Sequence, residues 1–362
     1  MMPPLHSPAT LIFPAVNQLA LDYCWAAKAR GERTVAAASV SGDAMGMDSG
    51  EVHRLPMVYE ADFQAVFLDL VADNSIDRIF CPVASVHGFM RRFIATQGLD
   101  IEVIGASPIR QQVEEHYRLM ARANRLLPLV ASCADGAAAF SAGDVAGVLR
   151  QASLIYGESN DEKLAAMMGA IASAPRADVV EIGSLMGRTA FVLLYLARRF
   201  DIGPLLTVDP WMSGHAVQKD APESLQGLVD EWDYEALSEG FFVNLAPFRE
   251  ADHAHLRMPS EQAFAVYTKG GPMLSPDAAR VHYSGRIAVL HVDGNHDYDA
   301  VRNDCDLWLD RLAPGAWLIL DDYVWAHGDG PHRVGDEVID GYRKRIERAF
   351  VCGTALFLKL HG

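Results

Sequence analysis

Short apolar runs alternate with helix-sized segments along the first third of the chain. The apolar residues of the intervening segments recur at the three- and four-residue spacing of an amphipathic helix. Alternation of this kind predicts a small domain in which helices pack on a parallel sheet. The strand-like runs of this part are Thr10–Val16, Thr34–Val40, Arg78–Val83 and Asp100–Gly105.

A long helical pattern over Ile109–Leu127 follows these runs. We expect Pro128 to end this helix, because proline has no amide hydrogen to donate. The segment Pro128–Asp144 is rich in Ala, Gly and Ser and is typical of a connection between domains. A length of 362 residues is also long for a single core. We therefore predict two domains, 1–135 and 136–362.

The second domain again alternates strands and helices. A strand at Asp178–Ile182 meets a glycine turn, and the next helix is expected to start near Ser184 or Leu185. Two further apolar runs, Ile287–Val292 and Trp317–Leu320, are joined by a helix-sized segment. Runs without polar alternation are typical of parallel strands that are buried on both faces. The pattern predicts an α/β fold with helices on both faces of the sheet.

Carboxylates follow both of these buried runs. Asp293 comes directly after the first run, with His296 three residues further on, and Asp321 and Asp322 follow the second. Neighbouring strands lie about 4.8 Å apart, so carboxylates at their ends repel one another by roughly 4 kcal/mol per pair. A divalent cation removes that cost, and oxygen ligands favour magnesium or manganese over zinc. The structural alternative is that Asp293 and Gly294 form only a strand-ending turn and that the Asp pair begins a solvated loop.

The turn after the first strand of the second domain reads E-x-G-x-x-x-G, from Glu181 to Gly187. It differs from the G-x-G-x-x-G of dinucleotide sites. Gly183 lets backbone approach a ligand closely, and the carboxylate at the strand end suits a ligand with a positive centre and no phosphate, such as S-adenosylmethionine. Asp209, about twenty-five residues further on, ends the next strand at the place of an acid that holds ribose hydroxyls. The alternative is a turn that only packs within an α/β protein.

The composition narrows the class of partners. A formal net charge of −16 and a pI near 5.2 disfavour nucleic acid and anionic membrane surfaces, because both need clustered Lys and Arg. The five cysteines are scattered without a C-x-x-C pair, which indicates reduced thiols in a cytoplasmic protein. No apolar run is long enough to cross a bilayer, and the first residues lack the pattern of a secretory signal.

The first domain lacks both phosphate-binding glycine motifs, G-x-G-x-x-G and G-K-[ST]. It loosely resembles the small Rossmann-like domains that precede nucleotide-binding or ligase modules. A scaffolding, dimerising or substrate-shaping role is favoured over a ligand site. We expect any homo-oligomer to form through this domain.

Four segments of the second domain together resemble a known family. They are E-I-G-S-L-M-G from Glu181, L-L-T-V-D-P-W around Asp209, H-V-D-G-N-H-D-Y around Asp293 and W-L-I-L-D-D-Y ending at Tyr323. They look like the class I S-adenosylmethionine-dependent methyltransferases. More narrowly, they resemble the metal-dependent O-methyltransferases of natural-product tailoring that modify macrolide sugars, with similar proteins in cephalosporin biosynthesis. The resemblance covers roughly Asn160 to the C-terminus.

The resemblance implies a cofactor, a metal and an acceptor. The cofactor is S-adenosylmethionine, the metal is Mg²⁺ or Mn²⁺, and the acceptor is a small-molecule hydroxyl whose proton His296 removes as general base. Close relatives often have Glu-Asp at the acidic pair, whereas this chain has Asp-Asp, which leaves ligation by the shorter Asp321 an open question. The implied cofactor residues are Glu181, Gly183, Ser184, Gly187, Asp209 and, near the adenine, Ser260. The implied metal ligands are Asp293, Asp321 and Asp322.

Two other functions stay open on the sequence. One is other chemistry in the same superfamily, such as N-methylation or partnership with a hydroxylase. The other is a non-catalytic cofactor-binding subunit whose first domain docks a partner. The motifs do not name the acceptor. Substrate specificity is expected to depend on the segments Ser213–Glu239 and Val266–Tyr283, on the loop after Tyr323 and on the first domain.

Overall fold

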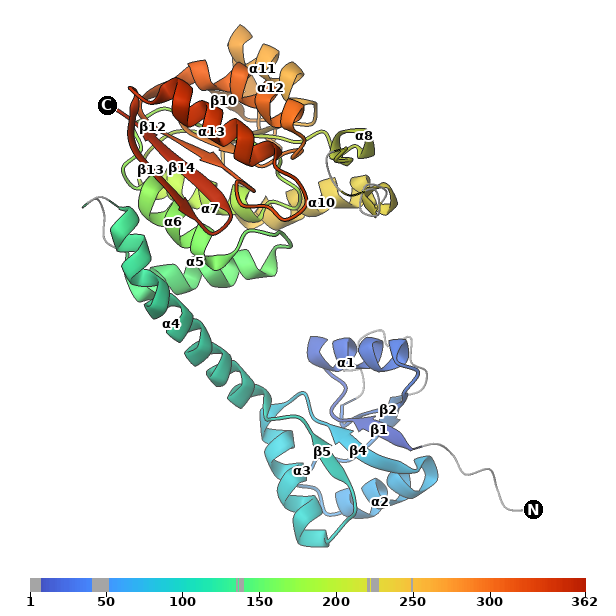
Figure 1. Ribbon diagram of the computed structural model, residues 1–362. Coiled ribbons are helices and arrows are strands. Elements are labelled where there is room, and N and C mark those ends of the chain that lie inside the picture. Colours follow the sequence, from blue (N-terminus) through green and yellow to red (C-terminus); the bar gives the residue numbers. More distant parts are fainter. Residues whose placement is uncertain are drawn as a thin grey trace. The chain divides into compact units, whose positions relative to one another are not determined.

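The computed structural model describes residues 8–40, 52–134, 136, 140–219, 222, 228–248 and 250–362. The chain forms two compact units, Met1–Arg118 and Leu119–Gly362, and each is a sheet with helices packed on it (Figure 1). The predicted α/β class is confirmed. The division falls inside helix α4 (Pro108–Cys133), whereas the predicted boundary at 135/136 lies just beyond the end of that helix.

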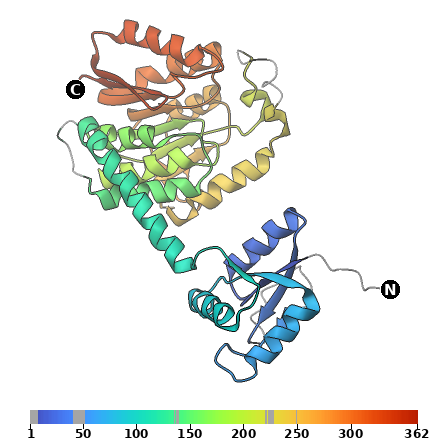
Figure 2. The same cartoon turned by 60° about the horizontal axis from the view of Figure 1, so that its bottom comes forward.

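The N-terminal unit is a five-stranded parallel sheet with the order β3-β2-β1-β4-β5. Helix α1 covers one face, and α2 and α3 cover the other (Figure 2). The sequence pattern misses only β3, an edge strand of three residues that is too short to show a pattern. The elements are β1 (Ala9–Ile12), α1 (Gln18–Ala29), β2 (Arg33–Ala38), β3 (Val52–Arg54), α2 (Phe63–Asn74), β4 (Ile76–Phe80), α3 (Ala84–Gln97) and β5 (Glu102–Ile104).

Helix α4 continues through Pro128, so the prediction that this proline ends the helix is wrong. The carbonyl that loses its helical donor is that of Asn124, and both residues lie on the exposed side of the helix, where water can replace the donor. The opposite side carries an apolar stripe that packs into the C-terminal unit and holds the helix in place. That stripe is Leu119, Ala123, Leu126, Val130 and Cys133.

The C-terminal unit is a seven-stranded mixed sheet with the order β13-β14-β12-β11-β6-β7-β8. Strand β14 runs antiparallel to both of its neighbours, and the other pairs are parallel. Its strands are β6 (Asp178–Ile182), β7 (Leu205–Val208), β8 (His253–Leu256), β11 (Ile287–Val292), β12 (Leu312–Leu320), β13 (Ile346–Cys352) and β14 (Ala355–Leu360), with a separate hairpin of β9 (Pro272–Leu274) and β10 (Arg280–His282).

Helices cover both faces of this sheet, as predicted. One face packs against α5, α6, α7 and α10, and the other packs against α11, α12 and α13 (Figure 1). Within the described ranges, every helix is too short or too polar to cross a bilayer. The helices are α5 (Ala142–Leu154), α6 (Asp161–Ile171), α7 (Arg188–Arg199), α8 (Ser213–Ala216), α10 (Tyr234–Leu245), α11 (Ser260–Lys269), α12 (Tyr298–Trp308) and α13 (Gly330–Tyr342), with short 3-10 turns η1 (Leu228–Glu231), η2 (Ala246–Phe248) and η3 (Leu309–Arg311).

The parallel strands β7, β6, β11 and β12 are consecutive neighbours, so their carboxyl ends meet at one edge of the sheet. Backbone hydrogen bonds continue between the strands past their ends. Gly183 donates to Val208, Asp293 donates to Ile182, and the N–H of Asp321 donates to the carbonyl of Val292, all at 2.8–2.9 Å. The residues that follow these four strands are therefore held in register with one another.

Two sequence expectations about this unit need correction. The helix after β6 begins at Arg188 rather than near Ser184 or Leu185, because the glycine turn is longer than expected. The expectation that Val266–Tyr283 forms a substrate loop is also wrong. The segment is the end of α11 and a hairpin, and the Tyr283 hydroxyl donates to the carbonyl of Leu205 at the amino end of β7, on the edge opposite the acidic residues.

Candidate active site

Gly183 opens the turn after β6 and adopts a φ of 83°, a region that favours glycine. A Cβ atom at this position would lie 1.9 Å from the carbonyl oxygen of Asp293. Only glycine lets the turn pack against the backbone at the end of β11. Glycine is therefore needed here for packing, and the expected cofactor turn directly contacts the first acidic residue.

Asp209 follows β7, and its carboxylate accepts three backbone N–H groups. Oδ2 accepts from Ser184 at 2.9 Å and from Leu185 at 3.0 Å, and Oδ1 accepts from Trp211 at 2.8 Å. Leu185 and Trp211 have φ values of 45° and 43°, which non-glycine residues rarely adopt and which often mark functional sites. Burial raises the pKa of the Asp209 carboxyl, against the lowering effect of the three donors. The acid expected to hold the ribose thus also shapes the turn.

Glu181 is fully buried, and both of its carboxylate oxygens have partners. The Ser184 hydroxyl donates to Oε2 at 3.0 Å, and His291 Nδ1 lies 3.2 Å from Oε1. Gly187 ends the turn with a φ of 91°, and a Cβ there would meet the Phe241 ring at 3.0 Å. The four residues predicted to line the methionine end of the cofactor site thus lie together in and beside this turn.

The predicted metal and catalytic residues meet at the ends of β11 and β12. The ligand atoms of Asp293, His296 and Asp322 all lie within 4.8 Å of one another, and we call these three residues the outer group. A second set, His291, Asp293 and Asp321, meets the same criterion and is called the inner group. Asp293 belongs to both groups, so the two share one carboxylate.

Lys163 is a residue of this cluster that the sequence interpretation missed. It lies in the first turn of α6, where its N–H donates to the capping Asn160 side chain at 2.9 Å. Its side chain is fully buried, and Nζ contacts Asp321 Oδ2, lies 3.4 Å from Asp293 Oδ2 and lies 3.0 Å from Ser159 Oγ. No motif marks it, because 130 residues separate it from Asp293 and a lysine in a first helical turn is normally solvated.

The Lys163 ammonium and the inner carboxylates control one another's charge. Burial lowers the pKa of Lys163, but the charges of Asp293 and Asp321 outweigh it and hold that pKa above its ordinary value. Burial also opposes ionisation of Asp321, yet the ammonium holds the pKa of Asp321 below its usual range. Burial and the nearby Asp321 charge raise the pKa of Asp293 well above its ordinary value. Asp321 is therefore the ion-pair partner of the lysine, and Asp293 is the carboxyl that resists ionisation.

His296 lies in the loop between β11 and α12 and has a partner at each ring nitrogen. Nε2 is 3.0 Å from Asp322 Oδ2, and the Gln218 side-chain amide lies 3.1 Å from Nδ1. Because an amide N–H can only donate, the network assigns a lone pair to Nδ1 and a proton to Nε2. The Trp325 ring packs edge-on against the imidazole at 4.8 Å. Asp322 has a φ of 50°, another left-handed non-glycine residue at this edge.

The segment after β7 is hydrogen-bonded to the loop that carries His296. Asn295 Nδ2 donates to the carbonyl oxygens of His215 and Val217 at 3.0 and 2.8 Å. Asp297 Oδ2 accepts from the backbone N–H of Lys219 at 2.9 Å. These bonds explain the polar residues that flank His296 in the motif. Of the predicted substrate loop over 213–239, positions 220, 221 and 223–227 lie outside the described residues.

Ser260, expected near the adenine, begins α11 shortly after the end of β8. Its hydroxyl accepts from Trp308 Nε1 at 2.9 Å and hydrogen-bonds to the Asp304 carboxyl. Both partners belong to α12. Ser260 therefore lies near the same edge of the sheet and ties α11 to α12.

The donor set of the outer group fits a hard divalent cation. Asp293 and Asp322 offer carboxylate oxygens on partly exposed side chains, 24% and 21% accessible. Lys163 pairs with Asp321, so a divalent cation would favour the ionised form of Asp293 beside Asp322. Magnesium typically takes one or two protein carboxylates and keeps its other positions for water or substrate oxygens. Asp293 and Asp322 are the residues that would hold such an ion.

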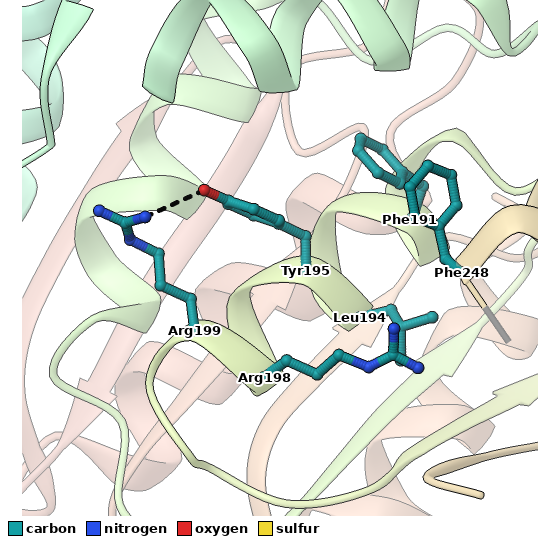
Figure 3. Close-up of a pocket in the computed structure, with 6 residues that line it drawn as sticks. All are labelled: Phe191, Leu194, Tyr195, Arg198, Arg199 and Phe248. Carbon is teal, nitrogen blue, oxygen red and sulfur yellow. Dashed lines mark hydrogen bonds between the residues drawn. The ribbon is translucent and has the colours of Figure 1, made fainter. Parts of the chain in front are cut away.

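A surface pocket of about 380 Å³ lies elsewhere in this unit (Figure 3). It is built on α7 and includes Arg198 and Arg199 from the last turn of that helix. Arg198 pairs with Asp252, which precedes β8, so the pocket extends toward the amino edge of the sheet. Arg199 is paired with Asp144. The acidic residues lie at the carboxyl edge, and the pocket is separate from them.

Several solved structures are distantly similar to this chain. The O-methyltransferase NovP is 15% identical, with 62% of this chain and 84% of that chain covered and a TM-score of 0.39. The calicheamicin methyltransferase CalS11 is 12% identical over 71% of this chain and 94% of that chain, with a TM-score of 0.38. The methyltransferase PaMTH1 of Podospora anserina is 12% identical over 72% and 98%, with a TM-score of 0.37. Scores this low indicate only a distant likeness.

The sequence itself gives one family match. No curated protein matches the chain. Residues 180–323 match the model of a family described as a methyltransferase domain. This span begins in β6 and ends just after Asp322, so it contains every predicted cofactor, metal and catalytic residue. The glycine turn and the acidic cluster therefore lie within the span that matches a methyltransferase domain, in agreement with the resemblance to class I methyltransferases.

Proposed function

We propose that the protein is an S-adenosylmethionine-dependent O-methyltransferase that uses a divalent cation and acts on a small-molecule hydroxyl. The observation that carries the proposal is the backbone contact between the Gly183 turn and Asp293. That contact brings the expected seat of the methyl donor beside the acidic cluster. A donor and an acceptor held side by side need little further ordering before reaction.

The outer group supplies the ligands and the base. A divalent ion held by Asp293 and Asp322 would lower the pKa of a substrate hydroxyl. His296 lies beside Asp322, and its Nδ1 lone pair is the place where a proton can be accepted. Because the Gln218 amide occupies that lone pair, it must give way to the substrate hydroxyl. Asp322 keeps the opposite ring nitrogen protonated and so fixes the tautomer.

The turn supplies the cofactor site. S-adenosylmethionine would bring the methyl group as a positively charged sulfonium. The buried Glu181 places negative charge beneath the turn, and Asp209 holds the turn's backbone in position. Both features suit a cofactor with a positive centre near the end of β6.

A transfer assay with methyl-labelled S-adenosylmethionine tests the proposal. The purified chain is given panels of small hydroxyl and amine acceptors, with Mg²⁺ or with a chelator. We expect label in a hydroxyl acceptor, loss of transfer with the chelator, and recovery when Mg²⁺ is returned. Full turnover in the chelator contradicts the metal, and transfer to amines alone contradicts the O-directed reaction. Absence of S-adenosylmethionine binding contradicts the cofactor and favours another role.

A further inference from the structure

The acidic cluster has two places for positive charge, and they differ in what surrounds them. His291 and Asp321 of the inner group are buried, whereas all three residues of the outer group are partly exposed, including the shared Asp293. Both groups use Asp293. One cation in the outer group and a different cation in the inner group would together neutralise the carboxylates, and the two cations would not compete for the same position.

The inner place already holds a cation, the ammonium of Lys163. Its side chain has no exposed surface, and Nζ contacts the carboxylates of Asp321 and Asp293. Helix α6 aims this side chain at the end of β12, with the Ser159 hydroxyl as a further partner. A buried ammonium in contact with two carboxylates occupies the space that a metal ion would need.

Both carboxylate oxygens of Asp321 already have partners. Its Oδ1 accepts from the N–H of Asp322 at 2.9 Å and from the Thr354 hydroxyl at 3.1 Å. Its Oδ2 accepts from Lys163. Its side chain is 7% accessible, against 21% for Asp322. The two consecutive carboxylates therefore face different surroundings.

His291 also lies between a buried carboxylate, that of Glu181, and a partly exposed one, that of Asp293. Its Nδ1 lies against Glu181, which leaves the lone pair on Nε2. Nε2 is buried, has no hydrogen-bond partner among the residues that the structure describes, and lies 3.8 Å from Asp293 Oδ2. The imidazole thus lies beside Asp293 in the inner group as a neutral ring.

We propose that Lys163 is the permanent cation of the inner group, that Asp321 is its positioning partner, and that the divalent metal is held by Asp293 and Asp322 alone among the carboxylates. This inference rests on the proposed metal-assisted function. It reassigns Asp321, which the sequence resemblance places among the metal ligands.

Manganese in crystals of the unaltered protein gives the direct test. Anomalous scattering locates Mn²⁺, and we expect one ion bonded to Asp293 and Asp322, with Lys163 still bonded to Asp321. An ion bonded to Asp321 overturns the inference and leaves the proposed function standing. No bound Mn²⁺ in a protein that binds S-adenosylmethionine contradicts both the inference and the metal part of the function.

Variants provide a second test in solution. The double variant Lys163→Met with Asp321→Asn removes the ion pair as a unit and keeps the formal charge of the cluster. We expect Asp322→Asn to weaken Mn²⁺ binding, measured by calorimetry, at least about tenfold more than the double variant does. Equal losses in two folded variants overturn the inference. Thermal unfolding of each variant shows whether it is folded, and the crystals decide the question if the double variant is not.

Discussion

Asp321 and Asp322 are neighbours in the sequence, yet their side chains have different environments. The left-handed backbone of Asp322 turns its carboxylate toward His296, while Asp321 points to the buried ammonium of Lys163. A tandem of identical residues thus provides one ion-pair partner and one accessible carboxylate. At the residue scale, the chemistry of the site depends on this separation and on the proton held by His296.

His296→Gln tests the role of the imidazole. The variant removes the proton acceptor, and we expect turnover to fall by about 10²–10⁴-fold, the usual contribution of a general base. Binding of S-adenosylmethionine should stay unchanged, because the turn expected to hold it makes no contact with His296 among the described residues. Label transfer and a cofactor titration measure the two effects.

The matched control is His282→Gln. His282 is exposed in the hairpin at the amino edge of the sheet, far from the acidic residues. This variant should keep full turnover. Unimpaired turnover in His296→Gln would remove the imidazole from the mechanism.

At the scale of elements, α12 connects the two motif-bearing strands and buries a carboxyl on its inner face. Asp304 is 6% exposed and hydrogen-bonds to Ser260 on α11. Burial raises the pKa of Asp304 from 3.8 to about 6, against the lowering effect of the Ser260 hydroxyl. Over a range of pH, Asp304 is therefore protonated in the folded protein and ionised in the unfolded protein.

Asp304→Asn should change how stability depends on pH. Because the folded pKa is raised, the folded protein binds the proton more tightly, and stability falls as pH rises from about 4 through about 6. The loss amounts to roughly 3 kcal/mol above that range. The variant, which is neutral and nearly isosteric, should match the unaltered protein near pH 3, below the unfolded pKa, and exceed it in free energy of unfolding at about pH 7.5.

Urea unfolding at several pH values measures this difference. Asp306→Asn, on the exposed side of the same helix, is the control and should leave the pH dependence unchanged. If Asp304→Asn shows the same stability difference at every pH, ionisation of Asp304 is not its cause.

At the scale of the whole molecule, the chain divides into two units that each have their own sheet and core. All the contacts of the candidate site described above are made within Leu119–Gly362. The role of the N-terminal unit, including its expected part in a homo-oligomer, stays a prediction.

A shortened chain of residues 108–362 tests this independence. It keeps α4 whole, with the apolar stripe that packs into the C-terminal unit. We expect it to fold and to bind S-adenosylmethionine as tightly as the full chain, because none of the site contacts is removed. It should also be monomeric by light scattering if oligomers form through the N-terminal unit. A folded fragment that has lost the cofactor would place a residue of 1–107 in the site.

Most elements could be predicted from the sequence, because buried parallel strands leave long apolar runs in it. The exceptions have physical reasons. Strand β3 is too short to show a pattern, and Pro128 is tolerated because the carbonyl it leaves without a donor faces water. The segment 266–283 is polar and rich in turn-forming residues. This composition fits a loop at either edge of the sheet, so it does not show which edge the segment borders. Its position depends on the contact between Tyr283 and Leu205, which no local pattern encodes.

The order of apolar and polar residues alone determined that Asp209, Asp293 and Asp321 follow strands, and that the strands are parallel. Carboxyl ends of neighbouring parallel strands lie at one edge, so the acidic cluster follows from local pattern. Only the tertiary structure decided what each carboxylate does there. Lys163 reaches Asp321 across 158 positions of sequence because α6 packs on the sheet, and Gly183 is needed because Asp293 lies directly against it. Contacts between distant segments depend on packing, and packing leaves no periodic signal in the sequence.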